Sequence, residues 1–408
     1  MSDWRKNAAK FQRWAKFALL AGALASLFFM LRFVVAHPVG TLDFVNLYSA
    51  GAIVHQGSSA RLYDLGLQQE LQKRLDPTGE FLPYIHPPFV AWVFAPLAYL
   101  PYADAYLVWG AFNLALLALI FYLLRFTPVR LDGDARLVWL VVCLPPVAGT
   151  IVLGQDSLVV ALAFLLAYLA LVRRRNFLAG LALGVGLGRF EIMLPLAFVF
   201  LLRRRWRVIA GFATASALAV LASAAVVGWE GLANYAKVLV ALGRAREGVG
   251  KVVDVAAMPS LRGALAAFSG NSIPPELLFS LSVLGSLALL IWAAWEFRSI
   301  GKPGSPAFDL QFSFAAIAAL LASYHLFAHE LTLLILLAFL ILGFEGVAHA
   351  SEPLLRRSGT RLLLLIPAVI IVGSALKFRA FSVLFVVLLG LLIWLARESA
   401  ILAKEPAA

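Results

Sequence analysis

Two histidines and a glutamate, in the segment SYHLFAHELTLL at residues 323–334, lie between two long apolar stretches. A charge at the centre of a membrane span costs roughly 2.5–3.5 kcal/mol, so ionisable side chains in such places are candidates for function. His325 and His329 are four residues apart, which would place them on one face if a helix continued through both, and Glu330 adjoins them. Imidazole and carboxylate groups so arranged could hold a metal ion or move a proton.

Other features of the sequence argue against a metal site and against a hydrolase. The zincin pattern H-E-x-x-H needs its second histidine where Leu333 stands. Cys143 is the only cysteine, which excludes a cysteine metal site and a disulfide framework within the chain. The Gly-x-Ser-x-Gly elbow of a serine hydrolase is absent from the sequence. We therefore predict no metal ligands and no required cofactor, although a divalent metal is compatible with these residues.

Further ionisable residues interrupt apolar sequence elsewhere. Asp43 lies in TLDFVNLYSAG, Asp156 in GQDS, and Arg189 and Glu191 in GRFEI. Plain structural alternatives exist for most of them. Asp156 could cap the helix that follows it, and Arg189 and Glu191 could simply neutralise each other. Which interpretation holds depends on whether these distant segments meet.

The elements that must position these residues are membrane spans. The chain has 408 residues, of which 62% are hydrophobic and 14% charged, and its mean hydropathy is +0.90. No water-soluble core of this length needs so much apolar surface. A helical span needs about 20 apolar residues, and such stretches recur from Phe17 to Ala396, which predicts about twelve spans. Their continuous Leu, Ala, Val and Phe runs predict an all-α polytopic fold rather than a barrel of alternating strands.

Basic clusters set the predicted orientation of these spans. The clusters occur at the N-terminus, Arg125–Arg136, Arg173–Arg175, Arg203–Arg207, Arg298–Lys302, Arg356–Arg361 and Arg397. The positive-inside rule places them, together with the N- and C-termini, in the cytoplasm. Membrane topology thus explains the net charge of +12, and we expect no nucleic-acid partner. The first span, Phe17–Ala36, has no signal-peptide cleavage site and is expected to be retained.

This topology makes residues 1–408 a single transmembrane domain with two external segments. Residues 37–103 form the first external loop, in which HPPFVAWVFAPLAYLP is expected to be a juxtamembrane or re-entrant helix. Residues 229–275 form the second external segment. The stretch 176–202 is too short for two crossings, so two short helices should meet at GRFE. Asp43, Asp156, Arg189 and His325 then all face the external side, which predicts one site there.

The order of several motifs resembles glycosyltransferase family 87, the polyprenol-phosphate-dependent membrane enzymes of GT-C architecture. The motifs are LDFVNLYSAG, YIHPPFVAWVFAPLAYLP, GQDSLVVALAFLLAYLALVRRR, AGLALGVGLGRFEIMLPLAFVFLLRRRWR, and MPSLRG followed by SYHLFAHELTLL. The resemblance covers roughly residues 40–340. The family usually has tyrosine, asparagine, lysine, proline and aspartate at or near the positions of His86, Asp156, Arg189, Tyr324 and Glu330. The chain therefore resembles a divergent member.

The resemblance implies transfer of a mannose-like hexose or a pentose from a polyprenyl-phosphate donor to a lipid or glycan hydroxyl, with inversion. The reaction would take place at the external face of a bacterial cytoplasmic membrane. GT-C enzymes have their general base soon after the first span, where Asp43 stands. The leaving phosphate needs cations and hydrogen-bond donors, which implies His325 as a second catalytic group, with Arg189 and Arg262. The other substrate-binding positions that the resemblance implies are His86, Gln155, Asp156, Glu191, His329 and Glu330.

Two other classes of protein are compatible with a polytopic chain. A transporter or lipid flippase for an envelope precursor would also carry polar groups in the membrane, but its halves are often related, and no such pairing is evident here. A non-enzymatic scaffold in envelope assembly would not explain why polar groups gather on one side. The partners expected of the enzyme are the donor, the acceptor and the membrane lipids.

Overall fold

The computed structural model describes residues 43–75, 77, 79–244, 255–270, 272–297, 302–376 and 381–402, together with Leu24 and Phe28. Within these residues the chain is helical and contains no strand, which confirms the all-α prediction. The N-terminal half contains α2 (Phe44–His55), α3 (Leu65–Leu75), α4 (Pro88–Phe94), α5 (Tyr102–Leu124), α6 (Gly133–Leu153), α7 (Ser157–Val172), α8 (Asn176–Val185) and α9 (Phe190–Leu202). The C-terminal half contains α10 (Trp206–Arg244), α11 (Leu261–Ser269), α12 (Pro275–Glu296), α13 (Pro306–Ala322), α14 (Leu334–Ala348), α15 (Ser358–Leu376) and α16 (Phe381–Leu402).

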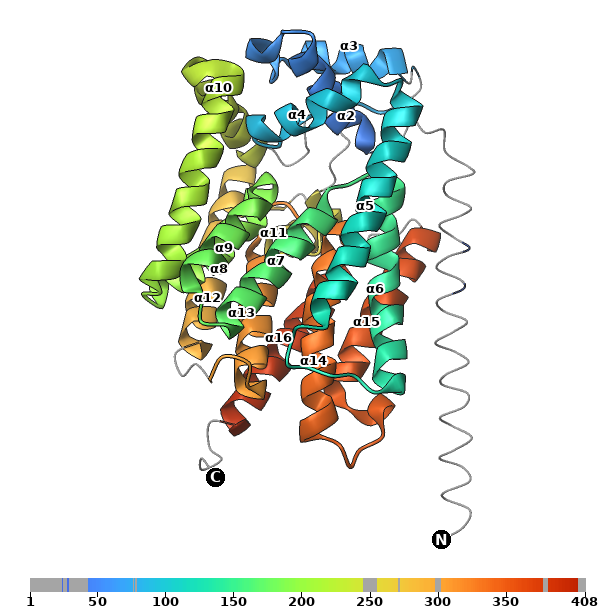
Figure 1. Cartoon of the computed structure of the whole chain (residues 1–408), viewed down its shortest axis with the longest axis vertical. Helices are drawn as coiled ribbons and strands as arrows, with labels where there is room; N and C mark the ends of the chain where they lie inside the picture. The colour runs from blue at the N-terminus through green and yellow to red at the C-terminus, as the bar shows by residue number, and fades with distance from the viewer. Residues whose placement is uncertain are drawn as a thin grey trace.

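The helices form a bundle that is covered at one end. The longer helices run lengthwise, and α2, α3 and α4 lie across their tops (Figure 1). Seven segments of the described chain are long and apolar enough to cross a membrane, and four shorter apolar helices accompany them. The chain is thus a polytopic membrane protein. The predicted first span, Phe17–Ala36, lies outside the described residues, so the count of about twelve spans stays a prediction.

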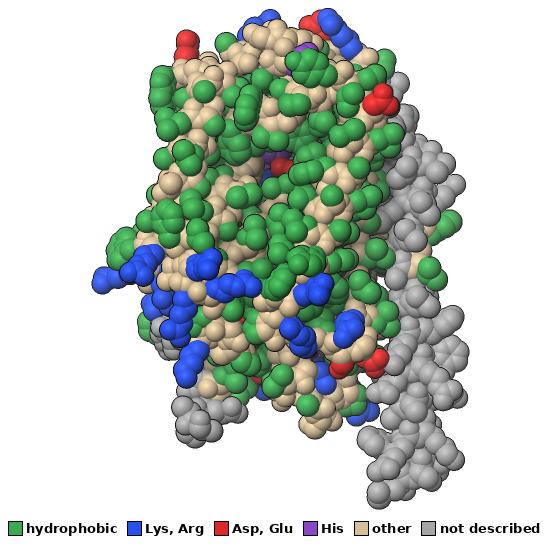
Figure 2. All heavy atoms as spheres, in the orientation of Figure 1, with side chains coloured by type: hydrophobic (Ala, Val, Ile, Leu, Met, Phe, Trp, Pro, Cys, Tyr) green, Lys and Arg blue, Asp and Glu red, His purple; other side chains and the backbone are tan. Residues whose placement is uncertain are grey.

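Basic side chains gather at the end of the bundle opposite α2, α3 and α4 (Figure 2). Two turns of similar geometry contribute to this group: Arg173 caps the end of α7 before Arg174 (φ 58°), and Arg203 caps the end of α9 before Arg204 (φ 52°). We call this end of the molecule the arginine end. Above it the visible surface is mostly hydrophobic, as a surface in contact with lipid must be (Figure 2).

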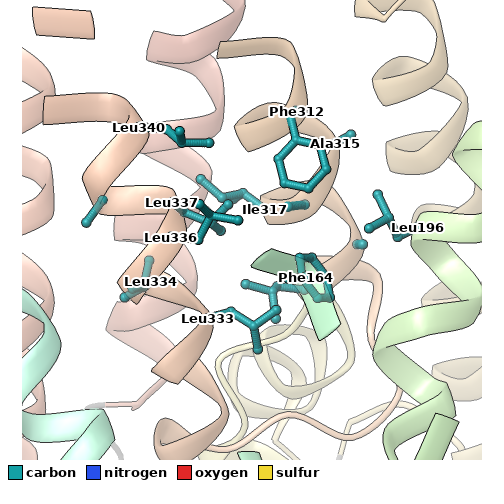
Figure 3. Close-up of a cluster of buried hydrophobic side chains, with 14 of the residues drawn as sticks. Phe164, Leu196, Phe312, Ala315, Ile317, Leu333, Leu334, Leu336, Leu337 and Leu340 are labelled. Carbon is teal, nitrogen blue, oxygen red and sulfur yellow. The ribbon is translucent and has the colours of Figure 1, made fainter. Parts of the chain in front are cut away.

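The core of the bundle surrounds α13 and α14. Every residue of α13 from Phe308 to Ala322 is buried, and 78% of the most apolar stretch within Ala328–Ala348 is buried, against 28% for α5. A helix that is hydrophobic on all sides needs neighbours on all sides. Phe164 of α7, Leu196 of α9, Phe312 of α13 and Leu337 of α14 are among the side chains that fill this centre (Figure 3). The rigid centre therefore supports the segment between α13 and α14.

Glycines let α8 and α10 approach closely. A Cβ on Gly180 would collide with the Val208 carbonyl, and a Cβ on Gly211 would collide with the Phe177 carbonyl. Gly184 is four residues after Gly180 and meets Ala215 in the same way. Small residues at this spacing are a common interface between membrane helices, because backbones can then touch. This contact fixes α8, and with it the short connection from α8 to α9.

The connection between α8 and α9 has the form that the sequence predicted. Helix α8 ends at Val185, a short 3₁₀ segment covers Gly186–Arg189, and α9 begins at Phe190. Helix α10 changes direction at Gly228 (φ 73°, ψ 171°), directly before the external segment predicted at residues 229–275. Arg189 therefore lies at the tip of two short helices, at the ends remote from the arginine turns.

Candidate functional site

Arg189 is the centre of the buried polar site. Its Nε donates to Oδ1 of Asp156 (2.8 Å), its Nη1 to Oε1 of Glu330 (2.9 Å), and its Nη2 to Oε1 of Gln155 (2.5 Å). The nearest Glu191 oxygen is 3.9 Å from Nη1, too far for a hydrogen bond. We call Arg189 and these four partners the Arg189 cluster. Its hydrogen bonds cross from the α8–α9 tip to two other segments, so the alternative in which Arg189 and Glu191 only neutralise each other is wrong.

Asp156 stands directly before α7 but does not cap it. The residue occupies the N-cap position with no hydrogen bond from its side chain to the helix, because the carboxylate turns to Arg189 instead. The capping alternative is therefore wrong for the side chain. Burial alone would raise the pKa of Asp156, but the positive charge of Arg189 holds it below its usual value. The carboxylate is ionised and forms a buried ion pair.

Helix α5 fixes the turn that carries Gln155 and Asp156. Tyr106 Oη donates to the Val152 carbonyl (2.8 Å), Trp109 Nε1 to the Gly154 carbonyl (2.9 Å), and Asn113 Nδ2 to the Gln155 carbonyl (3.2 Å). The three donors are spaced so that they share one face of the helix. Sequence analysis missed them, although a polar stripe at helical spacing in a lipid-facing helix was a usable signal.

Asp43 also occupies an N-cap position, before α2, and likewise makes no capping hydrogen bond with its side chain. Its Oδ2 accepts a hydrogen bond from Gln155 Nε2 (2.7 Å). Burial raises the pKa of Asp43 above its usual value, and Gln155 and Arg189 partly offset that rise. Asp43 is thus joined to Arg189 through the side chain of Gln155, which is 112 residues from Asp43 in the sequence.

His86 approaches the Arg189 cluster from the segment before α4. Its Nδ1 lies 3.1 Å from the Gly188 carbonyl and 3.8 Å from Oδ2 of Asp156. A carbonyl can only accept, so Nδ1 carries the proton and Nε2 presents a lone pair. Burial and the positive charge of Arg189 lower the pKa of His86 to about 4, so the ring is neutral at neutral pH.

Three tyrosines hold the backbone around His86, and sequence analysis gave no sign of them. Tyr63 Oη donates to the His86 carbonyl (2.7 Å), Tyr84 Oη to the Pro87 carbonyl (2.9 Å), and Tyr235 Oη to the Ile85 carbonyl (3.2 Å). The rings of Tyr63 and Tyr235 stack with centroids 4.8 Å apart. Tyr235 belongs to α10 beyond the kink at Gly228, so no local pattern could have linked it to His86.

The segment between α13 and α14 is not a continuous helix. Helix α13 ends at Ala322, and a 3₁₀ segment begins only at Ala328, so His325 and His329 do not share a helical face as the sequence suggested. Glu330 closes the break, because its Oε2 accepts from the Phe327 amide (2.6 Å) while Oε1 binds Arg189. The interruption of the helix after Ala322 thus allows the Glu330 carboxylate to reach the Arg189 cluster.

His329 is anchored through its backbone and leaves part of its ring unsatisfied. Thr150 Oγ1 and Thr332 Oγ1 lie 3.1 Å and 2.6 Å from its carbonyl, which ties the segment to α6. Its side-chain Nε2 is buried without a hydrogen-bond partner. A buried polar atom without a partner costs free energy, so its persistence here favours a role in binding.

Arg262 of α11 and His325 of the segment between α13 and α14 are the remaining predicted site residues. The Arg262 guanidinium lies 4.0 Å from the centre of the Tyr324 ring, and its Nη1 is 3.4 Å from the Tyr324 carbonyl. Burial and the positive charges of Arg189 and Arg262 hold the pKa of His325 well below its usual range. His325 is therefore neutral, and it is electrostatically coupled to both arginines. Direct contacts join seven of the ten predicted residues, namely Asp43, His86, Gln155, Asp156, Arg189, Glu191 and Glu330. Arg262, His325 and His329 are linked to this group through electrostatic interactions.

No group of three or more His, Cys, Asp or Glu side chains that could hold a metal occurs in the part of the chain that is described. The carboxylates of the Arg189 cluster are turned toward its guanidinium rather than toward a common empty point. The surface over the bundle is hydrophobic, but acidic, basic and histidine side chains are visible in a hollow of it (Figure 2). A solute that reached this hollow from the lipid would meet the charged groups directly.

The described chain is thus a polytopic helical membrane protein with a buried ionic site at the tip of α8 and α9. The family model for glycosyltransferase family 87 matches residues 84–324, more than half of the chain. The chain therefore belongs to glycosyltransferase family 87 and is a membrane glycosyltransferase. The resemblance inferred from its motifs is confirmed.

Two curated relatives bear the name polyprenol-phosphate-mannose-dependent alpha-(1-2)-phosphatidylinositol pentamannoside mannosyltransferase. The one from Mycolicibacterium smegmatis is 28% identical over 296 residues, which are 70% of this chain and 67% of the relative. The one from Mycobacterium tuberculosis is 28% identical over 233 residues, which are 54% of this chain and 51% of the relative. No solved structure matches the chain.

Proposed function

We propose that this protein transfers a sugar from a polyprenyl-phosphate donor to a hydroxyl of a lipid or glycan acceptor, at the external face of the membrane and with inversion. The observation that carries the proposal is the Asp43 carboxylate, which is held beside the Arg189 cluster by Gln155 (2.7 Å). The relatives that match this chain are named for polyprenol-phosphate-mannose and for a phosphatidylinositol mannoside acceptor, which supports both substrate classes.

In the proposed reaction Asp43 is the general base. The acceptor hydroxyl gives its proton to Asp43 as its oxygen bonds to the anomeric carbon, and the bond from that carbon to the phosphate oxygen breaks with its electron pair leaving on the phosphate. A base has most effect when its pKa approaches the working pH, and burial shifts the pKa of Asp43 in that direction. Attack opposite to the leaving phosphate inverts the anomeric configuration.

The charges of the site favour two subsites. The Arg189 cluster has three carboxyl groups around one guanidinium, and Asp43 adds a fourth. Such a surplus of acceptors suits sugar hydroxyls better than a phosphate, and His86 and His329 add neutral ring nitrogens on that side. Arg262 and the neutral His325, which interact electrostatically with each other, suit the leaving phosphate as hydrogen-bond donors. Arg189 then acts mainly by holding Asp156, Glu330 and Gln155 in place.

The surface around the site also favours a lipid-linked substrate. The helices beside the hollow in Figure 2 expose large apolar side chains, including Leu107, Val108 and Leu114 of α5 and Leu178 and Val185 of α8. A polyprenyl chain could remain in the hydrocarbon region while its phosphate and sugar enter the polar site. The donor would then reach the site by lateral diffusion within the membrane.

The test is a transfer assay with the purified protein and a panel of polyprenyl-phosphate sugars, in the parent and in Asp43→Asn. We expect activity with at least one donor and a loss of about 10²–10⁴-fold in the variant, because general-base catalysis contributes that much. Asp64→Asn is a matched control in the same loop, since Asp64 pairs with the exposed Arg61 and accepts from the Leu67 amide. Determination of the product's anomeric configuration by NMR tests inversion, and assays in sealed vesicles of known orientation test the face.

Each outcome has a distinct meaning. Equal activity in the parent and Asp43→Asn would remove Asp43 from the mechanism. No transfer with any donor, combined with movement of a lipid or solute across vesicles, would replace the proposal with the transporter or flippase alternative. An unfolded variant is recognised from its elution profile and thermal midpoint before activity is compared.

A further inference from the structure

The Gln155 side chain lies between the proposed base and the Arg189 cluster. Its Nε2 is 2.7 Å from Oδ2 of Asp43, and its Oε1 is 2.5 Å from Nη2 of Arg189. We propose that Gln155 is a positioning residue that fixes the orientation and proton-accepting state of Asp43, rather than a group that binds the substrate. The inference rests on the proposed function, because it assigns a role within that reaction.

The direction of these two hydrogen bonds is not a free choice. A guanidinium has five N–H donors and no acceptor, so the Gln155 oxygen must face Arg189. The amide NH₂ must then face Asp43, so Oδ2 of Asp43 must accept the hydrogen bond from Gln155. The reversed amide would set donor against donor at Arg189 and oxygen against oxygen at Asp43. Arg189 therefore determines, through Gln155, that Oδ2 of Asp43 is an acceptor.

The position of Gln155 is fixed as firmly as its orientation. Its carbonyl accepts from Asn113 Nδ2, and the preceding Gly154 carbonyl accepts from Trp109 Nε1. Gly154 has φ 70°, and a Cβ there would lie 2.6 Å from Cβ of Phe44, the first residue of α2. The turn thus packs directly on the residue after Asp43. The distance between the Gln155 amide and the Asp43 carboxylate is set by the fold and does not need a substrate.

Gln155 leaves Oδ1 of Asp43 as the oxygen for the acceptor hydroxyl. Burial raises the pKa of Asp43, while the Gln155 hydrogen bond and the Arg189 charge act in the opposite direction. Helices α3, α4 and α5 pack near α2, and within the described residues they bring no other charged group to bear on this carboxyl. Loss of the Gln155 amide should therefore keep Asp43 protonated to higher pH.

The decisive substitution is Gln155→Glu, which keeps the shape and replaces the donor by an oxygen. One oxygen of the new carboxylate would pair with Arg189, and the other would face Oδ2 of Asp43, where two carboxyls close together hold a proton between them. We expect the acidic limb of the pH profile of kcat to shift to higher pH by about one unit or more. At pH values below the limb, kcat should therefore be about tenfold lower than in the parent. Activity should recover toward alkaline pH.

The control is Gln56→Glu, which adds the same charge at the exposed far end of α2 and should leave the profile unchanged. Gln155→Leu provides a second variant, which removes both hydrogen bonds and should lower kcat more than it raises KM. A Gln155→Glu enzyme whose kcat falls equally at all pH values, or whose KM alone rises, would overturn the positioning role. A parent without transfer activity would instead overturn the proposed function, and this inference with it.

Discussion

Buried acidic side chains occur in two regions of the molecule, and they are paired differently. At the arginine end, Asp309 accepts from Tyr168 Oη (2.6 Å), and Glu345 accepts from the Gly359 amide (2.8 Å) and Thr360 Oγ1 (2.6 Å). Each of these acids joins two neighbouring helices and has its hydrogen bonds satisfied by local donors. In the Arg189 cluster, carboxylates from three segments share one guanidinium, and Nε2 of the nearby His329 is buried without a hydrogen-bond partner.

The difference separates a structural use of buried charge from a functional one. A fold that needs only to satisfy an acid can do so with one hydroxyl or amide on the next helix. A site that must bind and transform a substrate keeps groups whose hydrogen bonds are incomplete until the substrate arrives. The two regions therefore make opposite predictions: substitutions at the arginine end should change stability alone, and substitutions at the site should change activity.

Arg189→Met should have the largest effect on stability and activity, because Arg189 is the shared partner of the buried carboxylates in the cluster. The variant would leave Asp156 and Glu330 buried without their partner, and breaking a buried ion pair from one side costs about 3–5 kcal/mol. We expect a large drop in the thermal midpoint in detergent together with loss of transfer. Arg174→Met, in an exposed turn at the arginine end, is the control.

Arg189→Lys refines the same experiment. Lysine keeps the charge but lacks the planar fork that reaches Asp156, Glu330 and Gln155 at once, so it should restore part of the stability and little of the activity. Full stability in Arg189→Met would show that the cluster is not held by this guanidinium and would remove the distinction between the two regions.

Tyr168→Phe tests the structural side of the comparison. Removal of the hydroxyl leaves Oδ1 of Asp309 without its donor in the core, which should cost about 1–3 kcal/mol while the packing of the ring is kept. We expect a lower thermal midpoint and a transfer rate that is close to that of the parent once the protein is folded. A fall in kcat without loss of stability would instead connect Asp309 with the chemistry.

The same contrast explains what the sequence could predict. Asp43, Asp156, Arg189 and His325 were recognisable because ionisable residues beside apolar spans are unusual, and the length and continuity of the apolar runs predicted the helical fold. The sequence could not reveal that the carboxylates of Asp43 and Asp156 turn away from the helices that they precede, since N-cap positions normally use such side chains locally.

Contacts across long stretches of chain were also beyond the sequence. The break after Ala322 depends on Glu330 reaching both Arg189 and the Phe327 amide, so helical spacing wrongly placed His325 and His329 on one face. Tyr235 donates a hydrogen bond to the Ile85 carbonyl, beside His86, although the two residues are 150 positions apart in the sequence. Such contacts depend on how distant segments pack together, so they cannot be predicted from local residue patterns.

The smallest predicted effect concerns His86 and the dependence of stability on pH. The pKa of His86 is about 4 in the folded protein, below the value near 6.5 of an exposed histidine. Between these values the unfolded chain binds the proton more readily, so this residue destabilises the fold as pH falls from 6.5 toward 4. Relative to pH 7.5, its contribution should be about 1 kcal/mol at pH 5.5.

His86→Asn isolates this effect, because its amide can still donate to the Gly188 carbonyl but does not titrate. The thermal midpoint of the parent should fall more steeply than that of the variant between pH 7.5 and 5.5. His55→Asn, at the exposed end of α2, should keep the slope of the parent. If the thermal midpoints of the parent and His86→Asn fall in parallel as the pH is lowered, protonation of His86 does not destabilise the fold. The ring would then be available to the reaction as a cation, and His86 would no longer count among the neutral ring nitrogens proposed for the sugar.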